Sequence, residues 1–76
     1  MVITQLTIFV DSKDHSKVIK KVPFLYETKE GNLIYTSNND VKTEWEIVEI
    51  QADVIFEFDV TCIIRTIVLN YSLNNL

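Results

Sequence analysis

The stretch "VIFEFDVTCIIRTIVLN", residues 54–70, runs for seventeen residues without a glycine, a proline or another clear turn signal. As one straight strand it would span about 55 Å, at ~3.3 Å per residue. A compact domain of this chain length is only roughly 30 Å across. The stretch must therefore bend, break or leave the body of the domain to contact something else.

The first part of this stretch has the clearest strand pattern in the chain. The polar residues Glu57, Asp59 and Thr61 alternate there with apolar ones. The apolar residues are Val54, Phe56, Phe58 and Val60. Alternation with a period of two predicts a half-buried strand. We therefore expect these four apolar side chains to point into the core.

Residues 62–69 lose the alternation and are apolar on both faces. A strand with two apolar faces has to be covered on both. The pattern favours a bend or bulge near Thr61 and Cys62, followed by a curved strand over residues 62–70. A helix that runs to Tyr71 is the alternative, although β-branched residues are weak helix formers.

An apolar strand of this kind pairs readily with another chain when it lies at a sheet edge. We therefore expect the segment either to cross the sheet centrally or to pair with its counterpart in a homodimer. The residues that would carry self-association are Ile63, Arg65, Ile67 and Leu69.

The N-terminal half also alternates. Residues 2–10 predict a strand, and residues 18–28 predict a second one, in which Pro23 lacks a backbone donor and indicates a sheet edge or a bulge. The turn "KEGN", Lys29–Asn32, contains the single glycine of the chain. It predicts a hairpin between the second strand and a short third strand over residues 33–36.

Residues 41–51 fit two patterns. Trp45 and Val48 have helical spacing, whereas Trp45 and Ile47 alternate with glutamates as in a strand. The isoleucine and valine content favours a strand. A short helix around residues 40–51 is the alternative.

The whole chain, residues 1–76, therefore predicts a single small domain that is mainly β. We expect an antiparallel sheet of five to six strands, curled into a small barrel or sandwich. The hydrophobic fraction of 47% supports a globular core. The only cysteine, Cys62, excludes an internal disulfide and is expected to be an inert core residue.

The charge pattern argues against direct nucleic-acid binding. The net charge is −4, and the segment from Asp40 to Asp59 has seven acids against one base. Phosphate binding requires clustered lysine and arginine. The lysines Lys17, Lys20 and Lys21 are instead expected to solubilise an edge strand.

The chain begins without a recognisable secretory signal, and its apolar runs are too short for a membrane span. We expect a cytoplasmic protein that makes no membrane contact. Asp11, Asp14 and His15 match no metal-ligand motif and predict an ordinary polar loop, so no metal or cofactor is expected. Glu57 and Asp59 could form an acid–base pair, but alternating acids are more typical of a solvated strand face.

The function predicted from these features is a non-enzymatic protein-binding module. We expect a small acidic inhibitor or regulator, of the kind that phages and other mobile elements carry, which docks on a larger partner with a basic surface. The residues expected at this contact are Glu44, Trp45, Glu46, Glu49, Glu57 and Asp59. The alternative is a structural subunit that self-assembles through its C-terminal strand.

Overall fold

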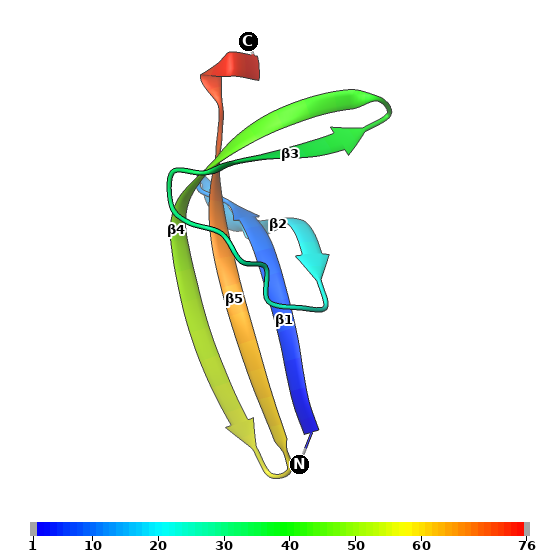
Figure 1. Ribbon diagram of the computed structural model, residues 1–76, viewed down its shortest axis with the longest axis vertical. Coiled ribbons are helices and arrows are strands. Elements are labelled where there is room, and N and C mark those ends of the chain that lie inside the picture. The colour runs from blue at the N-terminus through cyan, green and yellow to red at the C-terminus, as the bar shows by residue number, and fades with distance from the viewer. Residues whose placement is uncertain (1, 76) are drawn as a thin grey trace.

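In the computed structural model, which describes residues 2–75, the chain forms one five-stranded sheet (Figure 1). The elements are β1 (Val2–Asp11), β2 (Asp14–Val22), β3 (Leu33–Asn38), β4 (Val41–Glu57), β5 (Val60–Tyr71) and the short 3-10 helix η1 (Leu73–Asn75). Their order across the sheet is β2-β1-β5-β4-β3. The predicted mainly β fold with a small curled sheet is confirmed.

One pairing differs from the expected antiparallel sheet. β1 and β5 run parallel, from Val2 beside Val60 to Asp11 beside Leu69, whereas the other neighbouring strands are antiparallel. The sheet is therefore mixed, and it does not close into a barrel. Parallel neighbours need a long connection, and here β2, β3 and β4 all lie between β1 and β5 in the chain.

The seventeen-residue stretch breaks at Phe58 and Asp59, which form the turn between β4 and β5. Neither the bend predicted near Thr61 and Cys62 nor the alternative helix occurs, because residues 60–71 form one strand. β5 crosses the sheet centrally between β1 and β4, as one of the two expected arrangements required.

The inward orientation predicted for Val54, Phe56, Phe58 and Val60 is wrong, because all four side chains are exposed. Alternation indicates that two faces differ, but it does not show that anything covers the apolar one. The β4–β5 hairpin extends past the core, so no part of the described chain lies over these residues.

Residues 41–51 lie in β4, so the favoured strand is confirmed and the alternative helix around 40–51 does not occur. The preceding turn explains why. Asn39 and Asp40 have φ angles of 52° and 65°. Two successive positive φ angles make the tight turn whose twist matches a β-hairpin, so β4 folds directly back on β3.

The hairpin predicted around Lys29–Asn32 is wrong. β2 ends at Val22, just before Pro23, and pairs with β1, while β3 pairs with β4. The proline cannot donate a ladder hydrogen bond, so the chain leaves the sheet there. Gly31, with a φ of 89°, turns the connecting segment instead, and its N–H donates to the carbonyl of Ile47 at 2.7 Å.

The main hydrophobic cluster lies on one face of the sheet, while Val10 and Val68 are buried on the opposite face. It is built on Phe9, Ile47, Ile67 and Leu69, with half-buried Ile19, Val22, Tyr26, Ile34, Trp45 and Ile50 packed around them. Phe9 and Tyr26 meet edge to face, with ring centroids 5.5 Å apart. Three of the four central residues come from β4 and β5, which explains the strength of the apolar pattern there.

The connection between β2 and β3, residues 23–32, crosses this core face (Figure 1). The fully buried Thr7 fastens it: its Oγ1 donates to the Phe24 carbonyl at 2.6 Å and accepts from the Tyr26 N–H at 2.9 Å. Arg65 Nη1 donates to the Tyr26 carbonyl at 2.8 Å. These bonds satisfy the backbone of a segment that has no strand partner.

Thr7→Val keeps the shape of the side chain but removes both hydrogen bonds to the connection. Stability should fall by about 1–3 kcal/mol, because a part-buried donor and acceptor lose their partner. Hydrogen exchange at the Tyr26 amide should also become faster. Thr7→Ser is the control, since it keeps the hydroxyl and should keep this amide protected. Equal Tyr26 exchange in the valine and serine variants would contradict this role of Thr7.

Candidate protein-binding surfaces

The sheet continues past its core as a three-stranded projection, which we call the arm. It comprises residues 2–5 of β1 and residues 53–64, which include the ends of β4 and β5 and their turn. Figure 1 shows it at the bottom, with the start of β1 beside the β4–β5 turn. The arm makes the molecule elongated, with extents of 48 × 24 × 22 Å.

Seven large apolar side chains of the arm are exposed: Val2, Ile3, Val54, Ile55, Phe56, Phe58 and Val60. The strand register places Ile3, Val54 and Phe56 on the face that carries the core. It places Val2, Ile55 and Val60 on the opposite face. Phe58, in the turn, is 102% exposed, and Phe56 is 78% exposed. Both faces and the tip of the arm are therefore apolar and uncovered.

The arm is also acidic. Asp53, Glu57 and Asp59 are exposed there, and residues 2–5 and 53–64 contain no lysine or arginine. The nearby Arg65 is already engaged, since its Nη1 lies 3.3 Å from Glu27 Oε1 and contacts the Tyr26 carbonyl. Asp59 lies in the turn, so it does not face the same way as Glu57 along one strand, as the acid–base alternative required.

The predicted contact residue Glu44 holds the segment that follows β5, from Ser72 to Asn75. Its carboxylate accepts hydrogen bonds from Ser72 Oγ at 2.6 Å, Asn74 Nδ2 at 2.7 Å and Tyr35 Oη at 3.0 Å. The bonds from Ser72 and Asn74 lower the pKa of Glu44, and the carboxylate in turn raises the pKa of Tyr35. This carboxylate is thus bound within the chain.

The other predicted protein-binding residues are spread over the molecule. Trp45 packs against Tyr71, with ring centroids 5.5 Å apart, and its Nε1 donates to Thr36 Oγ1 at 2.9 Å. Glu46 and Glu49 are exposed on the face opposite the core. Only Glu57 and Asp59 lie at the tip of the arm, on either side of Phe58.

The predicted self-association residues are divided in the same way. Ile67 and Leu69 are each 0% exposed in the core and are unavailable to a partner. Arg65 is half-buried beneath the connection, and Ile63 is half-buried on the arm.

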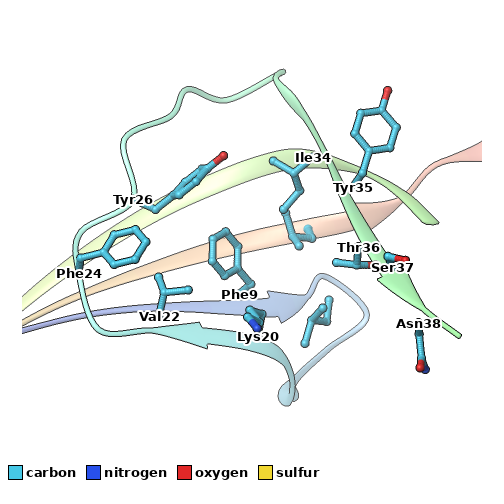
Figure 2. Close-up of a pocket in the computed structure, with 12 residues that line it drawn as sticks. Phe9, Lys20, Val22, Phe24, Tyr26, Ile34, Tyr35, Thr36, Ser37 and Asn38 are labelled. Carbon is cyan, nitrogen blue, oxygen red and sulfur yellow. The ribbon is translucent and has the colours of Figure 1, made fainter. Parts of the chain in front are cut away.

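A groove opens between the two edge strands of the curled sheet (Figure 2). Its volume is about 600 Å³, and its apolar lining is Phe9, Ile19, Val22, Phe24, Tyr26, Ile34 and Leu69. Lys20 of β2 borders it on one side, and Thr36, Ser37 and Asn38 of β3 border it on the other. Sequence patterns missed this groove because it depends on how far the sheet curls.

The polar segment near the β1–β2 turn contains ordinary turn bonds. Asp11 accepts from the Lys13 N–H at 2.9 Å, and Asp14 accepts from Ser16, which lowers the Asp14 pKa. Within residues 2–75, no group of three or more His, Cys, Asp or Glu side chains is placed to hold a metal ion. No helix in this part of the chain is long and apolar enough to cross a membrane.

Comparison with known proteins identifies no relative of this chain. No family model matches the chain, and neither the curated proteins nor the solved structures include a significant match.

Glu44→Gln should destabilise the protein at neutral pH and have little effect in acid. A carboxylate whose pKa is lowered by folding stabilises the fold above its unfolded pKa, and this stabilisation disappears as the pH falls through the folded pKa. Urea unfolding of both proteins across the acid range measures the difference. Glu46→Gln, at an exposed position outside this cluster, is the control. A difference between wild type and Glu44→Gln that does not shrink in acid would contradict the assignment.

Proposed function

We propose that this protein is a non-enzymatic protein-binding module that docks through its arm. The observation that carries the proposal is the exposed apolar set on the arm, from Val2 and Ile3 to Phe56 and Phe58. These seven residues are 41% to 102% exposed and gather on the two faces and the tip of one projection, whereas exposed apolar residues on a typical monomer are scattered singly. Clusters of exposed apolar residues commonly mark interaction sites.

The charges on the arm favour a protein partner of a particular kind. Asp53, Glu57 and Asp59 would repel nucleic-acid phosphates and anionic lipid headgroups. A protein surface with an apolar centre and a basic rim would bury the apolar residues and neutralise the acids. A small acidic inhibitor or regulator that covers such a surface on a larger protein fits this arrangement.

The arm variant Phe56→Asp/Phe58→Asp tests the proposal. Tagged wild type and the variant are used as baits, and recovered proteins are quantified by mass spectrometry. A purified partner is then titrated against both baits. We expect affinity to fall at least about 30-fold, since truncating a central interface aromatic typically costs 2 kcal/mol or more.

Leu73→Asp is the matched control, because Leu73 is 80% exposed and lies in η1, outside the arm. It should bind as the wild type does. Circular dichroism verifies that all three proteins are folded. Recovery of the same proteins, with the same affinity, by wild type and the arm variant would refute docking through the arm.

Self-assembly is the second candidate function, and a specific observation favours it. The groove between β2 and β3 has an apolar lining and a lysine at its border. The groove therefore offers the apolar surface and the positive charge that suit a partner of the arm.

A further inference from the structure

We infer that the surface that receives the arm is the groove of a second copy of this chain, with Phe58 of one copy inserted between β2 and β3 of the other. The inference rests on the proposed function, because it takes the arm as the docking surface, and it names the partner.

The tip and the groove match in size and polarity. A cavity of about 150 Å³ accommodates a benzene-sized ring. The groove has a volume of about 600 Å³, so it has room for the Phe58 ring together with neighbouring arm side chains. Phe24 at the groove is itself half exposed and would be covered by the incoming ring.

The tip of one chain cannot fill its own groove. Val60, beside the tip, and Leu69, in the groove lining, are nine residues apart on the same strand, β5. At ~3.3 Å per residue they are separated by about 30 Å. Because one continuous strand connects them, the two sites can meet only between copies.

The charges are complementary as well. Glu57 and Asp59 flank Phe58 and are exposed. Lys20 lines the groove, whereas Lys21 of the same edge strand lies on the opposite face of the sheet. When the ring enters from the β2 side, the two acids come to lie beside Lys20. Opposite potentials of this kind fix the orientation of an interface.

Reciprocal exchange increases the area that a dimer buries. Each copy has one tip and one groove, so a two-fold arrangement makes two such contacts and places the two arms side by side. A stable interface buries about 800 Å² per partner. The tip, one face of each arm and the groove lining all contribute to this area.

The first test is the mass of the purified protein by size-exclusion chromatography with light scattering. We expect the wild type to self-associate at micromolar concentration, Phe58→Asp to be a folded monomer, and Leu73→Asp to self-associate as the wild type does. Position 58 is fully exposed, so the substitution leaves the core intact. A wild type that stays monomeric at high micromolar concentration would overturn the inference.

The second test addresses the charges. Lys20→Glu should weaken self-association at least tenfold, whereas Lys29→Glu, the same charge change at an exposed position away from the groove, should not. Adding Asp59→Lys to Lys20→Glu should restore association. If the double variant Lys20→Glu/Asp59→Lys does not associate, the arm docks elsewhere on the partner and not beside Lys20.

Mixing distinguishes tip-in-groove from tip-to-tip packing. Phe58→Asp has an intact groove and Lys20→Glu has an intact tip, so an equimolar mixture should form a mixed species when neither protein associates alone. If Lys20→Glu alone still associates while Phe58→Asp does not, the tips pack on each other and the groove assignment is wrong. Suppose that the wild type is monomeric and that Phe58→Asp weakens binding to a purified foreign partner. Self-docking would then be refuted, and the arm would remain the docking surface.

Discussion

The parallel pairing of β1 with β5 is the contact on which the rest of the molecule depends. It joins the β1–β2 hairpin to the antiparallel unit made by β3, β4 and β5. It places β5 at the centre of the sheet, with β1 on one side and β4 on the other, so that both backbone edges of residues 62–69 are paired. It also leaves β2 and β3 as the two edges, which border the groove.

The connection that makes this pairing possible also limits the core. Residues 23–32 cross the sheet at the level of Thr7 and Arg65, where hydrogen bonds hold their backbone. Beyond that level no other part of residues 2–75 covers the three strands, and their apolar side chains are exposed in the arm. Exposed apolar surface of this kind is typical of interaction sites, which is why we propose the arm as the docking surface.

The arm and the groove have matching chemistry at separate places on one sheet. Tight β4–β5 pairing carries Phe58 to the tip with an acid on each side, while the open edges leave an apolar groove beside Lys20. Residues that the sequence suggested for binding have other tasks: Glu44 binds the C-terminal residues, and Ile67 and Leu69 build the core. The docking that we propose therefore depends on where the sheet stops being covered rather than on the longest acidic or apolar run.

The sequence by itself determined the local conformations. Alternation predicts strands at β1 and in the second half of β4, β-branched residues favour strands for residues 41–51 and for β5, and Asn39 and Asp40 accept the positive φ angles of a tight turn. The pattern does not predict the end of β2 before Pro23, because it places a strand over residues 18–28. Only the tertiary structure decided that β2 pairs with β1 instead of β3, that Val54, Phe56 and Val60 remain exposed, and that a groove opens between the edges. The reason is that alternation is a local property, which separates the two faces of a strand. Which face is covered depends on contacts between residues far apart in the chain, such as Thr7 with Phe24 and β1 with β5.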